Sequence, residues 1–350
     1  MLHYCYKLIP LYAIRNRDVT MPLISAVIPC YNEEESLPLF LAEFQNVCRM
    51  MKQKWDDLDF EIVLVDDGSA DRTLDVFEQA SNNENFVFSV KWISFSRNFG
   101  KEAALYAGLQ HAQGDYVATL DADMQDPPSL LPQMYEILQN EDYDNVATRR
   151  QDRKGEPPIR SWFARRFYSL INHISKADIV DGARDFRLMK RTMVDAILQV
   201  SEYNRFSKGI YGWVGFKTKW ISYENVDRIA GKTKWNFFKL FVYALDGIVA
   251  FSTTPLVIAS LIGIILCILA FALIIFVIVR TVIFGDPVAG WPSLICVITF
   301  IGGIQLLSIG VLGQYLAKTY LETKHRPIYI IRQQGKSVSS HSNGNIAIAD

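Results

Sequence analysis

Two long apolar segments without a charged residue constrain this chain of 350 residues more than any other feature. The first runs from Pro255 to Val279 and the second from Trp291 to Tyr315, and each contains 25 residues. About 20 consecutive apolar residues suffice to cross the hydrocarbon core of a bilayer. The sequence therefore predicts two transmembrane helices, at 253–280 and 289–317, joined by a short connector.

Basic residues flank the two predicted spans unequally. Lys232, Lys234 and Lys239 precede the first span and five Lys or Arg follow the second, whereas the connector contains only Arg280. Because Lys and Arg accumulate in cytoplasmic loops, we expect both ends of the chain on the cytoplasmic side of the membrane. Glycines in the second span allow close contacts between helices. A homo-oligomer formed through the transmembrane helices is therefore a partner arrangement that the sequence allows.

The charges are strongly segregated, although the net charge is only −1. Residues 21–148 contain 7 Lys and Arg against 23 Asp and Glu, whereas residues 149–239 contain 20 against 9. A basic segment after an acidic one indicates that the second half binds something anionic. The five cysteines form no CxxC pair, which disfavours a zinc site or a disulfide framework.

Ahead of the spans, segments typical of strands and helices alternate. Four β-rich apolar runs, LISAVIP, FEIVLVDD, SVKWISFS and DYVATLDAD, are separated by helical segments, and the first run is expected to end at Pro29. This alternation predicts an α/β domain with a mostly parallel sheet and helices on both faces. We expect an N-terminal extension at 1–20, this domain at 21–230, an amphipathic juxtamembrane helix at 231–252 and a cytoplasmic tail at 318–350 whose end is disordered.

Polar motifs follow all four predicted strands. They read PCYNEE, DDGSAD, SRNFGK and DADMQD in chain order. Ligands of parallel α/β sheets bind beyond the carboxyl ends of the strands, so the motifs predict a single crevice. Neither GxGxxG nor GxxxxGK[ST] occurs, which argues against a dinucleotide fold of the Rossmann type and against a P-loop.

Asp121 and Asp123 are the candidates for a metal site. If both stand on the end of the fourth strand, alternate residues share a face and both carboxylates reach one cation. Mg²⁺ and Mn²⁺ prefer oxygen ligands and commonly link a carboxylate to substrate phosphates. The preceding Asp66-Asp67 pair fits the same crevice, and a capping turn for the helix that begins near Asp71 is its alternative role.

Five motifs in order, PCYNEE, VDDGSADRT, SRNFGKEAAL, DADMQDPP and GARDFRLMKR, resemble those of family 2 glycosyltransferases with a GT-A fold. Within that family the chain is most similar to polyprenyl-phosphate sugar transferases, namely dolichol-phosphate mannose synthases and, more closely, bactoprenol glucosyltransferases. The resemblance covers about Pro22 to Tyr320. It implies a GT-A head, a nucleotide-sugar donor, a polyprenyl phosphate acceptor and a place in the bacterial cytoplasmic (inner) membrane.

The resemblance also implies roles for single residues. The base and ribose of the nucleotide would be held at Pro29, Tyr31, Glu33, Val65 and Asp67. A divalent cation, Mg²⁺ or Mn²⁺, would bind to Asp121, Asp123 and Gln125, with Ala122 against the nucleotide. The phosphates would meet Arg149, Arg228 and Lys234, and the last two fit the family pattern RxxGxSKW with Thr233 in place of Ser.

The implied reaction is a direct displacement at the anomeric carbon with inversion, in which cations neutralise the leaving group. Asp123 and Lys234 are candidate catalytic residues together with Asp185, which would orient an acceptor or sugar hydroxyl. An ion pair with Arg184 or Arg187 is the alternative role of Asp185. The acceptor phosphate is expected at three basic residues, Arg165, Arg205 and Lys208, and a solvated position on the surface is the alternative for Arg205 and Lys208.

Glucose from UDP-glucose is the favoured sugar, with GDP-mannose, UDP-N-acetylhexosamine and UDP-aminoarabinose as alternatives. No QxxRW motif occurs, which disfavours a processive synthase and favours transfer of one sugar for modification of a cell-envelope glycan. A non-catalytic membrane adaptor is the alternative of another class, and the intact DAD motif argues against it. Nothing in the sequence predicts nucleic-acid binding.

Overall fold

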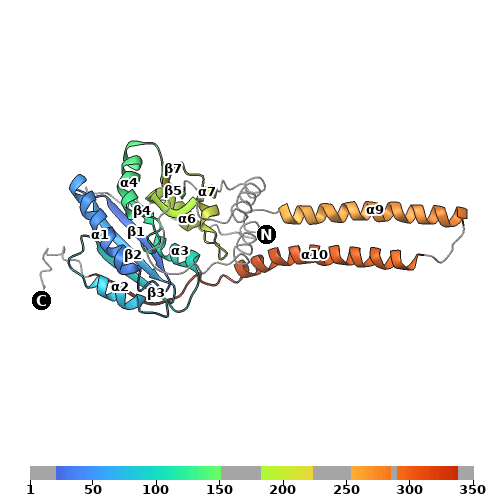
Figure 1. The fold of residues 1–350 in the computed structure, drawn as a ribbon, viewed down its shortest axis with the longest axis horizontal. Helices are drawn as coiled ribbons and strands as arrows, with labels where there is room; N and C mark the ends of the chain where they lie inside the picture. Colours follow the sequence, from blue (N-terminus) through green and yellow to red (C-terminus); the bar gives the residue numbers. More distant parts are fainter. Residues whose placement is uncertain (1–20, 151–182, 224–253, 285–289, 338–350) are drawn as a thin grey trace, which may run out of the picture.

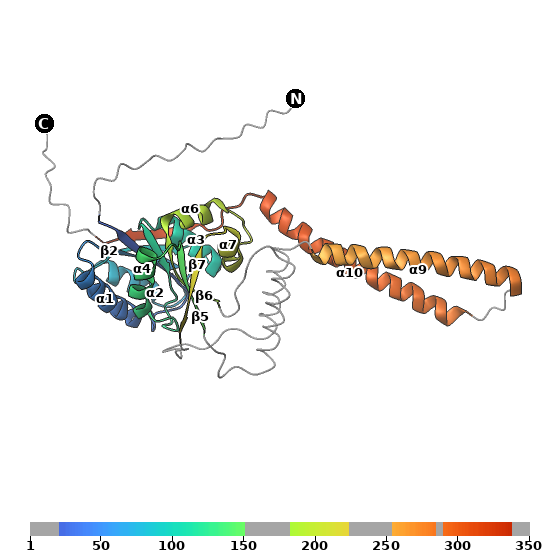
Figure 2. The ribbon, with the colours of Figure 1, turned by 90° about the horizontal axis from the view of Figure 1, so that it is seen from above.

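The computed structural model describes residues 21–150, 183–223, 254–284 and 290–337. Within these ranges the chain forms an α/β head and two long helices that extend from it side by side (Figures 1 and 2). The predicted N-terminal extension and juxtamembrane helix lie outside the described residues, as do Arg165, Arg228 and Lys234.

One eight-stranded sheet forms the centre of the head, in the order β7-β5-β6-β4-β1-β2-β3-β8. The strands are β1 (Leu23–Cys30), β2 (Asp59–Asp66), β3 (Ser89–Phe95), β4 (Tyr116–Thr119), β5 (Asn145–Arg150), β6 (Ala183–Lys190), β7 (Thr218–Tyr223) and β8 (Ile331–Lys336). The four strands β3, β2, β1 and β4 are parallel neighbours, while β6 and β8 run antiparallel to β4 and β3. The predicted α/β fold with a mostly parallel sheet is confirmed.

Helices cover both faces of the sheet because successive side chains of the central strands point to opposite sides. Ile24, Ala26 and Ile28 of β1 belong to the core under α1, α2 and α4, whereas Val27 belongs to the core under α3, α6 and α7. The helices of the head are α1 (Leu37–Lys54), α2 (Thr73–Ser81), α3 (Lys101–His111), the 3₁₀ turn η1 (Pro128–Leu130), α4 (Leu131–Asn140), α6 (Arg191–Gln199) and α7 (Ser207–Trp213).

The first strand does not end at Pro29, as the sequence predicted, but continues to Cys30. Val27 accepts a hydrogen bond from Leu120 N, so by strand parity the nitrogen of Pro29 also faces β4. Because β4 ends at Thr119, the missing N–H of Pro29 interrupts no hydrogen bond between these strands.

The fourth strand is shorter than predicted. It ends at Thr119, so Asp121 and Asp123 lie in the turn that follows, and the prediction that both stand on a strand is wrong. Met124 in this turn has a positive φ of 59°. The turn, rather than the period of a strand, brings the two carboxylates to the edge of the sheet.

The two uncharged runs form α9 (Thr254–Phe284) and α10 (Trp291–Thr323). Large apolar side chains of both helices are exposed, for example Phe271 at 67% and Leu306 at 72%. Among the described residues, Phe300–Thr323 is long and apolar enough to cross a membrane, and Leu256–Leu266 is a shorter apolar segment. The structure thus supports one candidate span by length and composition, not the two that the sequence predicted.

The chain returns to the head after α10. Residues 318–350 were expected to form a tail, yet Ile331–Lys336 form the edge strand β8 beside β3. The end of α10 and the start of α9 lie at the same end of the helical hairpin formed by α9 and α10, the end next to the head (Figure 1).

Candidate active site

The loops after β1 and β2 are joined by hydrogen bonds between their side chains and backbones. Asn32 N donates to Ser69 Oγ (2.9 Å), Ala70 N donates to Asn32 Oδ1 (2.8 Å), and Glu33 N donates to Thr73 Oγ1 (2.9 Å). The two loops line an open cavity of about 400 Å³, and four of the lining residues carry carboxylates, namely Glu33, Glu34, Glu35 and Asp71. Such acceptors suit the hydroxyl and N–H donors of a nucleoside rather than its phosphates.

The residues expected to hold the nucleoside lie at this edge of the sheet. Pro29 stands near the end of β1, and Tyr31 in the loop after it is 40% exposed. Glu33 lines the cavity, whereas Val65 is fully buried in β2. The first two strand ends therefore come together as the sequence predicted, but the full burial of Val65 disfavours its predicted contact with a nucleotide.

Asp67 is buried, and its carboxylate is engaged by the backbone. It accepts hydrogen bonds from Phe99 N (2.6 Å) and Gly100 N (3.0 Å), immediately before α3. Burial outweighs these hydrogen bonds and raises the pKa of Asp67 to about 6. Asp66 accepts from Ser69 N in the loop after β2 (2.8 Å) and from Ser94 Oγ of β3 (2.7 Å). Both carboxylates thus fix the loops of the crevice, while the turn before α2 is bonded by Asp71, which accepts from Thr73 N.

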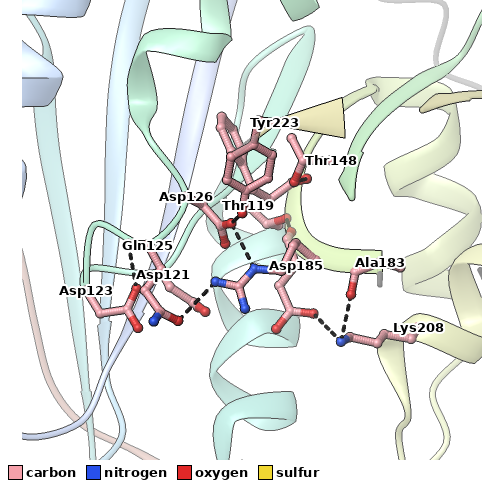
Figure 3. Close-up of polar contacts among 12 residues, drawn as sticks. Thr119, Asp121, Asp123, Gln125, Asp126, Thr148, Ala183, Asp185, Lys208 and Tyr223 are labelled. Carbon is pink, nitrogen blue, oxygen red and sulfur yellow. Dashed lines mark hydrogen bonds and ion pairs between the residues drawn. The ribbon is translucent and has the colours of Figure 1, made fainter. Parts of the chain in front are cut away.

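Four charged side chains from separate elements meet in the middle of the crevice. Lys101, the first residue of α3, places its Nζ 2.7 Å from Asp121 Oδ1 and 2.6 Å from Asp185 Oδ2. On the other side of Asp185, the Nζ of Lys208 from α7 lies 3.9 Å from Oδ1 and donates to Ala183 O at 3.1 Å (Figure 3). The network links the turn after β4 with β6, α3 and α7.

The two lysines determine the charge state of Asp185. Burial alone would raise its pKa, but Lys101 and Lys208 hold the pKa of this carboxyl well below its usual range. The pKa of Lys101 is in turn raised well above its usual value, because Asp121 and Asp185 outweigh its own burial. Asp185 is therefore an anion and Lys101 a cation at neutral pH.

The ion pairs of Asp185 are with Lys101 and Lys208, not with Arg184 or Arg187 as the alternative predicted, although the charge of Arg187 also helps to lower the pKa of this carboxyl. Arg184 donates through Nε to Asp126 Oδ1 (2.9 Å) and through Nη2 to Gln125 Oε1 (3.1 Å). The guanidinium of Arg187 stacks over the ring of Tyr211, 3.6 Å from its centroid.

A second polar layer supports the turn that carries the two aspartates. Asp126 is 1% exposed and accepts hydrogen bonds from Arg184 and from the hydroxyl of Tyr223 (Figure 3). Burial raises the pKa of Asp126 against the opposing effect of Arg184. Gln125, an expected metal ligand, gives its amide oxygen to Arg184. The turn is thus held in place by hydrogen bonds from Arg184 of β6 and Tyr223 of β7.

Two of the three expected metal ligands, Asp121 and Asp123, offer the carboxylate oxygens that a hard divalent cation prefers. Asp121 already faces a positive charge, the ammonium of Lys101, and Asp123 Oδ1 accepts from Gln125 N at 3.1 Å. No cluster of three or more His, Cys, Asp or Glu that could hold a metal occurs among the described residues. A cation here would take its remaining ligands from substrate phosphates and water, as Mg²⁺ commonly does.

The remaining expected residues lie at different depths. Ala122 is buried within the turn, and Arg149 at the end of β5 is exposed and donates through Nε to Ser222 Oγ (3.1 Å). Of the two described acceptor-phosphate candidates, Lys208 lies in the crevice beside Asp185. Arg205 is 8% exposed and stacks over Tyr106, 4.2 Å from the ring centroid. Its burial disfavours the predicted contact with a phosphate.

Sequence reasoning missed the part played by Lys101. This lysine stands in SRNFGK, one of the four strand-end motifs, and its position opposite the DAD motif was the available signal. It named Arg184 only as a candidate partner of Asp185, whereas this side chain reaches back to the turn after β4.

Comparison with known proteins finds relatives with similar sequences and a solved structure that is only distantly similar. Residues 25–198 match the family "Glycosyl transferase family 2". The chain is 43% identical over 313 residues to a prophage bactoprenol glucosyl transferase homolog of Escherichia coli (strain K12), covering 89% of this chain and 99% of the relative. It is 41% identical over 314 residues to the bactoprenol glucosyl transferase of Shigella phage SfV, covering 89% and 98%.

Among solved structures, glucosyl-3-phosphoglycerate synthase from Mycobacterium tuberculosis in complex with Mn²⁺, UDP-glucose and phosphoglyceric acid has a TM-score of 0.41 and 16% identity to this chain. The match covers 65% of this chain and 78% of that one. The family assignment therefore rests on the relatives in sequence.

Proposed function

Since the chain belongs to glycosyltransferase family 2 and is a glycosyltransferase of the bactoprenol glucosyltransferase type, we propose that it transfers one glucose from UDP-glucose to undecaprenyl phosphate. The observation that carries this proposal is the extent of the similarity. An alignment of 313 residues is longer than the head, so it includes the helical hairpin as well as the crevice. One named relative is a bactoprenol glucosyl transferase and the other is a homolog of one, which favours glucose as the sugar and a polyprenyl phosphate as the acceptor.

The proposed reaction is an inverting displacement. A phosphate oxygen of the lipid attacks the anomeric carbon of glucose, the bond from that carbon to the diphosphate breaks, and UDP leaves with the electron pair. A phosphate monoester is already anionic near neutral pH, so no protein base has to remove a proton. The leaving diphosphate gains negative charge in the transition state. The main task of the site is to neutralise that charge.

The residues of the crevice are suited to this task. Asp121 and Asp123 would hold the divalent cation, which would supply Lewis-acid neutralisation of the diphosphate when bound. Lys101 keeps Asp121 and Asp185 at fixed positions through its two ion pairs. We propose that Asp185 orients a hydroxyl of the sugar or the acceptor phosphate, and that Lys208, 3.9 Å away, meets the acceptor phosphate. Arg228 and Lys234 remain proposed phosphate ligands outside the described residues.

We further propose that both long helices cross the bilayer. α9 contains 31 residues and α10 contains 33. At 1.5 Å per residue, each exceeds the roughly 30 Å of a hydrocarbon core. Their exposed apolar side chains need a non-aqueous environment, and the return of the chain to β8 keeps both ends of the helical hairpin on the side of the head. The acceptor lipid would then reach the crevice at the membrane surface.

Purified protein in detergent, supplied with UDP-glucose, undecaprenyl phosphate and Mg²⁺ or Mn²⁺, should form undecaprenyl phosphate carrying a single hexose. Transfer should stop after one sugar, because the attacking phosphate is consumed in the reaction. Mass spectrometry of the extracted lipid measures the product directly. GDP-mannose and UDP-N-acetylhexosamine, offered in separate reactions, serve as donor controls.

Two results would contradict this proposal. A ladder of lipid species that differ by one hexose would show processive extension. Product from another donor but none from UDP-glucose would reassign the sugar while leaving the family unchanged.

The proposed topology predicts where the connector between the helices is exposed. A single cysteine introduced as Gly285→Cys, with the five native cysteines replaced by Ala, should react with a membrane-impermeant maleimide in intact spheroplasts. A cysteine introduced as Ser339→Cys, after β8, should react only after the membrane is permeabilised. The reverse pattern of labelling would invert the orientation, and equal labelling of both sites would contradict the two spans.

A further inference from the structure

The end of α10 is bonded to the head next to the crevice. The carboxylate of Glu322 accepts hydrogen bonds from Tyr203 N, at 2.9 Å to Oε1 and 3.1 Å to Oε2, and from Asn204 N at 3.2 Å. Tyr203 and Asn204 belong to the connector between α6 and α7, which has no regular secondary structure. An ionised carboxylate that accepts backbone N–H groups makes stronger hydrogen bonds than a neutral acceptor. Glu322 is therefore a firm anchor for this connector.

The connector leads in a few residues to Lys208, and each step is fixed. Arg205 stacks over Tyr106 of α3, and Ser207 donates from its backbone N to Glu102 Oε2 of α3 at 2.9 Å. Lys208 then places its Nζ near Asp185. Tyr203, Asn204 and the start of α7, where Lys208 is the second residue, thus form one short segment that is held by Glu322 at one end and by α3 at the other.

The chain beyond Glu322 is attached independently of this carboxylate. Tyr329 stacks on Phe95, with ring centroids 4.9 Å apart, and its hydroxyl donates to Gln110 Oε1 at 2.7 Å. β8 then pairs with β3. Loss of the Glu322 carboxylate therefore leaves the return of the chain to the head intact, and its effect should be local to the connector.

We propose that Glu322 is a positioning residue for the transfer reaction: through Tyr203 and Asn204 it holds the start of α7 so that Lys208 stays beside Asp185. This inference rests on the proposed function, since it assigns Lys208 to the acceptor side of the crevice. It makes the end of α10 a part of the site, even though Glu322 touches no substrate.

Glu322→Ala should raise the KM for undecaprenyl phosphate about tenfold, because Lys208 is then held less closely at the acceptor side, and leave the KM for UDP-glucose within about twofold. Glu322→Gln keeps one acceptor oxygen for Tyr203 N and should recover most of the loss. Thr323→Ala is the matched control, because the hydroxyl of this exposed neighbour on α10 bonds within the helix, to Tyr320 O. Equal rises in both KM values would contradict a role on the acceptor side.

A double-mutant cycle tests whether Glu322 acts through Lys208. In the Lys208→Ala background, Glu322→Ala should change the acceptor KM by less than about twofold, because the side chain to be positioned is gone. Independent effects that multiply would overturn the proposal.

Amide hydrogen exchange tests the same inference without activity. Glu322→Ala should speed exchange at residues 203–208 while β8 stays protected. Unchanged exchange in this segment would overturn the positioning role. Absence of any lipid product from the unmodified chain would overturn the proposed function instead, and faster exchange would still establish the anchor.

Discussion

Asp123→Asn should reduce glucose transfer by roughly 10²–10³-fold, the scale seen when a group that stabilises transition-state charge is removed. The substitution takes one of the two negative charges from the proposed cation site. It leaves the turn intact, because the amide oxygen of Asn can still accept the hydrogen bond from Gln125 N. The rate of product formation at saturating Mg²⁺ or Mn²⁺ is the measurement.

Cation binding itself provides a second readout for Asp123. MnCl₂ should raise the thermal unfolding midpoint of the unmodified chain, because a ligand that binds the folded state stabilises it, and should raise that of the Asp123→Asn variant much less. Asp142→Asn is the matched control: this exposed carboxylate pairs with Lys217, away from the crevice. Near-normal transfer by a folded Asp123→Asn chain would rule out the proposed metal site.

The parallel core of the fold could be predicted because its strands are buried on both faces. The run FEIVLVDD contains four consecutive apolar residues, IVLV, and the structure places this strand in the interior of the sheet. β8 gives no such signal, since its sequence, IRQQGK, is polar and most of its side chains are exposed. Its pairing with β3 depends on α10 returning the chain to that edge, which no local pattern encodes.

The carboxylates of the site could be predicted as well, whereas their partners could not. Lys101 is 20 residues from Asp121 and 84 from Asp185 in sequence, so their ion pairs depend on the complete fold. Arg205 shows the opposite error: it was expected to bind the acceptor phosphate, but the structure buries it. The ring of Tyr106 makes its burial possible. Composition indicates charge, but only packing decides which charges reach a substrate.

Asp185→Asn should lower both transfer and stability. Without this carboxylate Lys208 loses its ion-pair partner, and Lys101 keeps only Asp121, so the site holds two ammonium groups of which one is paired. Transfer should fall by about 100-fold, because the group proposed to orient a substrate is lost and its two cations shift. The free energy of unfolding should fall by about 1–2 kcal/mol, less than for a fully buried pair because Lys101 is 44% exposed.

The pH dependence separates this ion pair from a packing effect. In the folded chain the pKa of Asp185 lies below its value in the unfolded chain, which is about 4. The Asp185 carboxylate therefore stabilises the fold fully above about pH 4, and this stabilisation is lost as the pH falls through the pKa of the folded chain. The stability difference between the unmodified chain and the Asp185→Asn variant should therefore be constant from pH 8 to about pH 5 and shrink below about pH 4. Denaturant unfolding at several pH values measures it. A difference that stays constant down to acid pH would mean that the introduced amide disturbs packing rather than charge, and full transfer by this variant would remove Asp185 from the proposed site.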